Sequence, residues 1–238
     1  MNKKSLTLSS VLGVVLLASQ AAQAVPVVAY EWTEGGAGNG TNSIFNSFHN
    51  TTGPVLADDF TPSVSGNVVR VDWWGSLGVN AAGAADAWEI TFHNDNPAGT
   101  PSFPFISQHF VNTNGVDPDG DGVYFFSSSW TPEDAVVTAG QDYWFSVANA
   151  STNNWLWANA GGVGPTVGAE QYAALQSVGG APSTVAGPHD GPWIPTTDGQ
   201  NFAFRVWVDV PEPGTIPLLG VGLVGLMAAG FKKRRGRL

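Results

Sequence analysis

The chain has 238 residues, with 19 acidic and 9 basic side chains, and it contains no cysteine. The absence of cysteine excludes disulfides, thiolate metal ligands, iron–sulfur clusters and cysteine nucleophiles. Seven of the basic residues lie at the two ends, so residues 25–213 contain no lysine and carry a formal charge of 2 − 19 = −17. Such a surface repels nucleic-acid phosphates and anionic lipid headgroups, so we expect no nucleic-acid partner, whereas divalent cations and neutral sugars fit.

The first 24 residues have the three-part pattern of a secretory signal peptide. Lys3 and Lys4 precede an apolar stretch at 6–18, and the small residues Ala22 and Ala24 flank Gln23 after it. A charged start, a short apolar region and an Ala-x-Ala site are what signal peptidase recognises. We predict a signal helix and cleavage after Ala24; a retained N-terminal anchor is the alternative.

Residues 25–209 have the composition and periodicity of one all-β extracellular domain. Apolar and polar residues alternate at 88–92, 143–147 and 202–208, which is the period of a strand with one buried face. Further strands are predicted at 27–32, 55–60, 68–74, 105–111, 123–127 and 154–158. Nine short strands separated by Gly, Pro and Asn turns predict a two-sheet antiparallel β-sandwich, jelly-roll-like in topology.

Three other segments of this domain receive predictions of their own. The stretch 169–178 is the only one with a helical pattern. Residues 179–199 contain four prolines and are predicted to form a long surface loop, and the Gly- and Asn-rich stretch 34–43 a shorter connection.

Asp58 and Asp59 raise the question of glycoside hydrolysis, because that reaction uses two carboxylates on either side of one bond. Adjacent residues of a strand point to opposite faces, so we expect the two carboxylates to lie apart. Glu31 or Glu89 could pair with either one, but no pattern selects such a partner.

No G-x-S-x-G, Walker or dinucleotide motif occurs, and the four histidines lack zinc-site spacing. We therefore predict that the protein is not an enzyme; a secreted glycan hydrolase or lyase is the enzymatic alternative.

A calcium loop is predicted at Asp117, Asp119 and Asp121, where carboxylates occupy alternate positions and Gly122 follows. Hard cations such as Ca²⁺ prefer this density of oxygen ligands. The segment departs from an EF-hand loop, because its twelfth position is Ser128 and not the bidentate Glu. Calcium is thus a candidate cofactor, and an acidic hairpin turn is the alternative.

The ten tryptophans all lie in the β domain. Neighbouring residues such as Trp73 and Trp74 must face opposite sides of their strand, so one ring of such a pair is a candidate for exposure. Exposed rings stack on the apolar faces of sugars. We predict exposure and carbohydrate binding for Trp74, Trp155, Trp157 and Trp193; filling of the core is the alternative.

Residues 210–238 form a three-part tail. Pro211, Glu212 and Pro213 are stiff and extended, because proline fixes φ and cannot continue a helix. A 16-residue apolar run at 216–231 predicts a single membrane helix, with the flanking basic side chains extending its reach. Lys232, Lys233, Arg234 and Arg235 then hold that end on the cytoplasmic side. An ordinary C-terminal anchor is the alternative.

The order of Pro-Glu-Pro, short apolar helix and basic cluster resembles the PEP-CTERM sorting tail. This resemblance implies recognition by exosortase, cleavage near 211–213, a transient stage in the inner membrane, and delivery to the cell surface or extracellular matrix of a polysaccharide-exporting bacterium. The segments 57–60, 73–75, 90–92 and 140–145 also resemble β-sandwich domains of exported PEP-CTERM proteins. The expected function is that of a non-enzymatic surface or matrix protein associated with exopolysaccharide and biofilm. A carbohydrate-binding module that uses Trp and Ca²⁺ is the alternative.

Overall fold

The computed structural model describes residues 24–33, 45–46, 55–77, 86–102, 106–130, 135–149, 155–161, 164–171, 175–177, 193–195 and 201–210. Its strands are β1 (Val25–Trp32), β2 (Phe45–Asn46), β3 (Leu56–Phe60), β4 (Gly66–Leu77), β5 (Asp86–Asn94), β6 (Ser107–Thr113), β7 (Tyr124–Ser129), β8 (Val136–Val137), β9 (Tyr143–Asn149), β10 (Trp155–Trp157), β11 (Leu175–Ser177), β12 (Trp193–Pro195) and β13 (Phe204–Val210). Within these ranges, no helix has the length and apolar character needed to cross a membrane. The predicted signal helix and C-terminal membrane helix lie outside the described residues.

Each strand predicted from periodicity overlaps an observed strand, so the all-β prediction is confirmed. The helix predicted at 169–178 is wrong. Ala169 instead forms an antiparallel bridge with Thr61, and β11 pairs with β3 and β12. The backbone N–H and C=O groups of this segment form hydrogen bonds with neighbouring strands, and this tertiary pairing overrides its weak helical pattern. The predicted loop 179–199 also contains a strand, β12, which pairs with β11.

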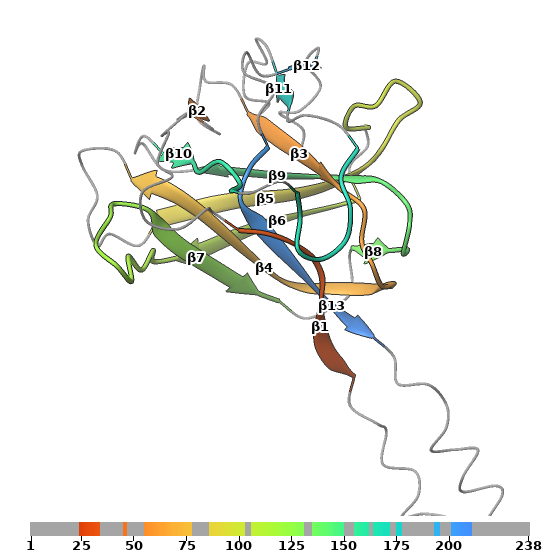
Figure 1. The fold of residues 1–238 in the computed structure, drawn as a ribbon, viewed down its shortest axis with the longest axis horizontal. Coiled ribbons are helices and arrows are strands. Elements are labelled where there is room, and N and C mark those ends of the chain that lie inside the picture. The colour runs from red at the N-terminus through yellow and green to blue at the C-terminus, as the bar shows by residue number, and fades with distance from the viewer. Residues whose placement is uncertain are drawn as a thin grey trace, which may run out of the picture. The chain divides into compact units, whose positions relative to one another are not determined.

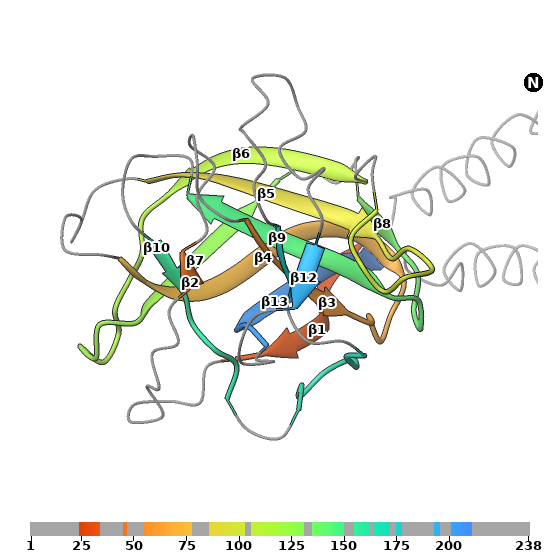
Figure 2. The ribbon, with the colours of Figure 1, turned by 90° about the horizontal axis from the view of Figure 1, so that it is seen from above.

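The strands form two antiparallel sheets, one of seven strands and one of six (Figure 1). In the seven-stranded sheet, residues 70–73 of β4 pair with both β13 and β7, so these two strands lie on opposite edges of β4. β1 lies beyond β13, and β10 and β2 continue the sheet near Gly75. The six-stranded sheet has the order β12-β11-β3-β9-β5-β6, and β9, β5 and β6 run side by side in Figure 2.

An aromatic core joins the two sheets. Trp73 of β4 meets Trp88 of β5 with ring centroids 5.5 Å apart, and Phe204 of β13 meets Phe145 of β9 at 4.8 Å. All four side chains are fully buried. Each large apolar side chain removed from water stabilises the fold by roughly 1.5–3 kcal/mol, which is how a chain without disulfides holds two sheets together.

A charged network lies on the opposite face of β4 and β13 from this core. Asp72 is fully buried and accepts hydrogen bonds from Arg70 Nε at 2.8 Å, from Arg205 at 3.2 Å and from the Trp207 indole at 2.8 Å. Arg205 also bonds to Glu31 of β1. These two arginines are the only basic residues of 25–213, so both are engaged in this network and away from the other acidic groups.

Candidate functional site

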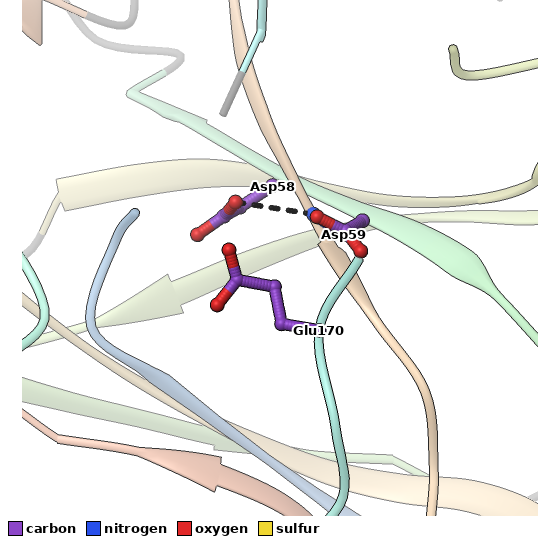
Figure 3. A group of neighbouring side chains, drawn as sticks. All are labelled: Asp58, Asp59 and Glu170. Atoms are coloured by element: carbon purple, nitrogen blue, oxygen red, sulfur yellow. Dashed lines mark hydrogen bonds between the residues drawn. The ribbon is translucent and has the colours of Figure 1, made fainter. Parts of the chain in front are cut away.

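Three carboxylates meet at the end of β3 (Figure 3). Asp58 and Asp59 come from β3, and Glu170 comes from the segment that follows Gly164. One oxygen from each residue lies within 4.8 Å of the other two. Both aspartates have no exposed surface, and Glu170 is half-buried. We call Asp58, Asp59 and Glu170 the acidic cluster.

Residues 164–171, here called the strap, bring Glu170 to β3. The strap runs beside β1 and the end of β3 (Figure 1). The Thr166 amide donates to the Glu31 carbonyl at 2.8 Å, and Ala169 and Thr61 exchange two backbone hydrogen bonds of 2.8 and 3.0 Å. The Gln171 amide also donates to Asp59 Oδ2 at 2.8 Å. Hydrogen bonds therefore hold the residues on both sides of Glu170.

Gly168 is required at the point where the strap turns onto β3. Its φ is +81°, in the left-handed region that favours glycine. A Cβ at this position would lie 2.6 Å from the Thr61 carbonyl oxygen, closer than two such atoms can approach. The absence of a side chain therefore permits both the turn and the close contact that positions Glu170.

The expected separation of the Asp58 and Asp59 carboxylates is wrong. The strand does alternate, since Leu56 and Phe60 pack into the main core and Ala57 packs against Trp144 on the other face. Among the described residues, however, β11 pairs with β3 only at Leu56 and Ala57, and the strap pairs with Thr61 just after the strand. Asp58 turns back so that its Oδ1 accepts a hydrogen bond from the Asp59 amide at 3.1 Å, and both carboxylates reach the strap.

Burial makes ionisation of the acidic cluster costly. It raises the pKa of Asp58 well above its usual value, and the charge of Asp59 adds to the rise, although the amides of Phe202 and Asp59 donate to Asp58 and oppose it. Burial, and then the charge of Asp59, raise the pKa of Glu170 to about 8. The cluster therefore requires protons or a cation near neutral pH.

Tyr30 of β1 lies next to the strap: a Cβ added at Gly168, two residues before Glu170, would lie 3.1 Å from the Tyr30 ring. Its side chain is fully buried against Phe60 and Phe204, with ring centroids 5.6 and 4.7 Å away. In the part of the chain that the structure describes, its hydroxyl has no hydrogen-bond partner. Burial, and then the charges of Asp58, Glu170 and Asp59, raise its pKa above the usual range. The phenol is thus a neutral hydrogen-bond donor beside the strap that carries Glu170.

The predicted calcium loop differs from the acidic cluster in the exposure and the hydrogen bonds of its carboxylates. Asp117, Asp119 and Asp121 also bring three oxygens within 4.8 Å of one another, but all three residues are at least partly exposed. Asp117 accepts hydrogen bonds from the Gly120 and Gly122 amides at 2.7 and 3.1 Å, and Asp121 accepts one from the Val123 amide at 2.8 Å. The loop thus satisfies the Asp117 and Asp121 carboxylates with its own backbone, as acidic hairpin turns do. Calcium binding here stays a prediction.

The exposure predicted for the tryptophans is wrong at three of the four positions. Trp155 and Trp157 have no exposed surface, and Trp74 is only 9% exposed. β10 lies alongside the continuous sheet edge of β4, which turns both of its rings into the core; Trp155 meets Trp88 at 4.9 Å. Arg205 covers Trp74 at 5.5 Å. Trp193 is the partly exposed one.

All but one of the predicted sorting and cleavage residues lie outside the residues that the structure describes. They are Pro211, Glu212, Pro213, Lys232, Lys233, Arg234, Arg235 and Ala22. Ala24 is described and directly precedes β1.

Sequence reasoning did not find Glu170 or Tyr30 as partners of the two aspartates. Glu170 lies 112 positions after Asp58 and inside a segment with a helical pattern, so no local spacing linked them. One signal was present: two adjacent acids interrupt the apolar strand 55–60 of a domain that has no lysine to neutralise them.

Comparison with known protein families gave two matches. Residues 31–161 match a family described as a domain of unknown function (DUF7901), which covers Asp58 and Asp59 but not Tyr30 or the strap. Residues 209–235 match the PEP-CTERM protein-sorting motif, as the resemblance of the tail implied. This motif supports an exosortase-sorted protein that is exported toward the cell surface. Comparisons with curated proteins and with solved structures gave no significant match. The chain belongs to the DUF7901 family and carries a C-terminal PEP-CTERM sorting motif.

Proposed function

We propose that this chain is a non-enzymatic protein of the cell surface or extracellular matrix that associates with exopolysaccharide in biofilms. The observation that carries the proposal is the sorting motif at 209–235, which directly follows the last strand of a β domain. In this proposal, residues 1–24 are removed as a signal peptide and residues 25–209 form a jelly-roll-like extracellular domain. Residues 210–238 hold the chain in the inner membrane by a single helix until exosortase cleaves it.

The burial of the acidic cluster supports a non-enzymatic role. A glycosidase must admit a sugar between its two carboxylates. Asp58 and Asp59 have no exposed surface, so a polysaccharide chain cannot reach them in this conformation. The burial of Trp155 and Trp157 likewise removes the basis on which a sugar-stacking platform was predicted. An acidic and lysine-free domain fits a structural component of a hydrated matrix better than either alternative.

Sorting is tested by following the product in host cells with and without exosortase. Wild-type protein is expected to leave the membrane fraction as a shortened product and to appear at the surface or in the matrix. A variant with Pro211, Glu212 and Pro213 replaced by alanine is expected to stay full-length in the membrane fraction, and Thr215→Ala serves as the matched tail control. Identical processing of the triple variant and the control, or of wild type in cells without exosortase, contradicts the sorting step.

Matrix association is tested separately. The surface product is expected to co-sediment with matrix polysaccharide from the host and to be released into the medium by cells that make no polysaccharide. Release of reducing sugar by the purified full-length chain would contradict the non-enzymatic assignment and would favour the glycan hydrolase.

A further inference from the structure

No lysine or arginine of residues 25–213 is left to balance the acidic cluster. Asp58, Asp59 and Glu170 bring three carboxyl groups together in a largely buried place. Residues 25–213 contain only Arg70 and Arg205 as basic side chains, and both are bonded to Asp72 or Glu31 on the outer face of the other sheet. Mutual repulsion of buried carboxylates costs more than that of exposed ones, because water screens them less. A buried group of three carboxyls with no lysine or arginine bonded to it among the described residues suits a positively charged ligand.

The Tyr30 hydroxyl is a second observation that points to a ligand here. A buried hydroxyl without a hydrogen-bond partner is uncommon in native proteins, since leaving it unsatisfied is costly. Tyr30 is fully buried, and its hydroxyl has no partner among the described residues. A water molecule carried by a cation supplies the acceptor that this hydroxyl requires.

The spacing of the oxygens fits calcium. Ca²⁺ binds oxygen at about 2.3–2.6 Å, so one ion can contact two oxygens that are up to about 5 Å apart. The three carboxylate oxygens lie within 4.8 Å of one another, which is inside this span. Mg²⁺ binds oxygen at about 2.0–2.1 Å and requires near-octahedral geometry, so one Mg²⁺ ion can contact two oxygens only when they are up to about 4.2 Å apart. Oxygens separated by as much as 4.8 Å therefore suit Mg²⁺ less well than Ca²⁺.

We propose that Asp58, Asp59 and Glu170 bind one Ca²⁺ ion, and that the Tyr30 hydroxyl donates a hydrogen bond to a water molecule of that ion. The ion links the strap to β3, because Glu170 belongs to the strap and the two aspartates belong to β3. Its effect is to fasten residues 164–171 onto the sheet edge. This site is separate from the predicted loop at Asp117 and does not depend on how the chain is sorted.

Calorimetric titration of CaCl2 into chelator-treated, full-length chain in mild detergent tests the proposal. Glu170→Gln keeps the size of the side chain and removes one ligand charge, and Asp119→Asn/Asp121→Asn is the matched control at the other acidic group. Glu170→Gln is expected to weaken binding at the cluster by at least about tenfold, and Tyr30→Phe by about tenfold, whereas the control variant keeps the site. MgCl2 is expected to bind more weakly than CaCl2.

The same variants are followed by thermal unfolding. Calcium is expected to raise the melting temperature of wild type and of the control, and not that of Glu170→Gln. Without calcium, Glu170→Gln is expected to melt higher than wild type because glutamine places no ionisable carboxyl in the buried cluster, and this rise also shows that the variant folds. Equal calcium binding by wild type and Glu170→Gln, no binding by either, or loss of binding only in the Asp119→Asn/Asp121→Asn variant overturns the proposal. If Glu170→Gln does not fold, Tyr30→Phe decides: unchanged calcium affinity overturns the proposal.

Discussion

Tryptophan residues of this chain differ in role according to their burial. Trp157 is fully buried, stacks on Phe202 at 4.7 Å and donates its indole N–H to the Ala203 carbonyl at 3.0 Å. Trp193 lies on the short strand β12, remains partly exposed and packs beside Trp144. The same residue type thus joins the two sheets in one place and covers a sheet edge in another.

Replacing each of the two by alanine should separate these roles. Trp157→Ala is expected to lower the free energy of unfolding by about 3–5 kcal/mol, because it leaves a large cavity in the core. Trp193→Ala is expected to cost about 1 kcal/mol or less. Urea unfolding followed by circular dichroism measures both. Similar losses for the two variants would contradict the assignment of Trp157 to the core and of Trp193 to the rim.

The strap is the element that completes the acidic cluster, although it is neither helix nor regular strand. Two isolated antiparallel bridges, Glu31 with Val167 and Thr61 with Ala169, hold it against β1 and the end of β3. Glu170 lies between the Ala169 bridge and the Gln171 amide, which donates to Asp59 Oδ2 at 2.8 Å, so backbone hydrogen bonds hold its neighbours on both sides. The position of this element determines whether the two aspartates face a third carboxylate.

Substitution of Gly168 tests the strap as an element. Gly168→Ala is expected to destabilise the protein by about 3 kcal/mol, because it combines a left-handed φ with the close contact to Thr61. Gly140→Ala is the matched control, since Gly140 has a φ of +77° and a Cβ added there would have no atom within 4 Å. The control is expected to cost about 1 kcal/mol from the backbone alone. Equal melting temperatures for the two variants would show that the contact with Thr61 does not hold the strap.

For the whole molecule, the dominant electrostatic feature is an excess of acidic side chains, three of which the fold brings together in the acidic cluster. Residues 25–213 carry 19 acidic and 2 basic side chains. Exposed carboxylates are screened by water and salt and cost little individually. The buried Asp58 and Asp59 with Glu170 do not have that screening, so the stability of the molecule should depend on pH through this cluster.

In calcium-free protein, stability is expected to fall as the pH rises from about 5 to 8. The pKa of Glu170 is raised from 4.5 to about 8, so between these values the folded state binds a proton that the unfolded state has lost. Folding is then favoured at the acidic end of this window. The raised pKa of Asp58 acts in the same direction, and the charge of Asp59 and the neutral Tyr30 phenol face the same group. Urea midpoints at pH 5, 7 and 8 measure the slope; Glu170→Gln should flatten it, and an unchanged slope would contradict this origin.

The sequence alone was sufficient to locate nine of the described strands and the sorting tail of this protein, whereas β11 and β12 fell in a predicted helix and a predicted loop. Alternation at 88–92, 143–147 and 202–208 is a local pattern, because a strand with one buried face needs only its own residues to show it. The tail is also contiguous, with its prolines, apolar run and basic cluster in one stretch, so its identity did not depend on folding.

Only the tertiary structure decided which side chains meet. Glu170 reaches Asp58 because backbone bridges place the strap beside Glu31 of β1 and Thr61 at the end of β3, and such pairings join residues more than 100 positions apart. The burial of Trp155 and Trp157 likewise follows from the alignment of β10 with β4, and not from any property of the three-residue segment itself. Strand formation is governed by neighbours in the chain, whereas burial and charge clustering are governed by neighbours in space.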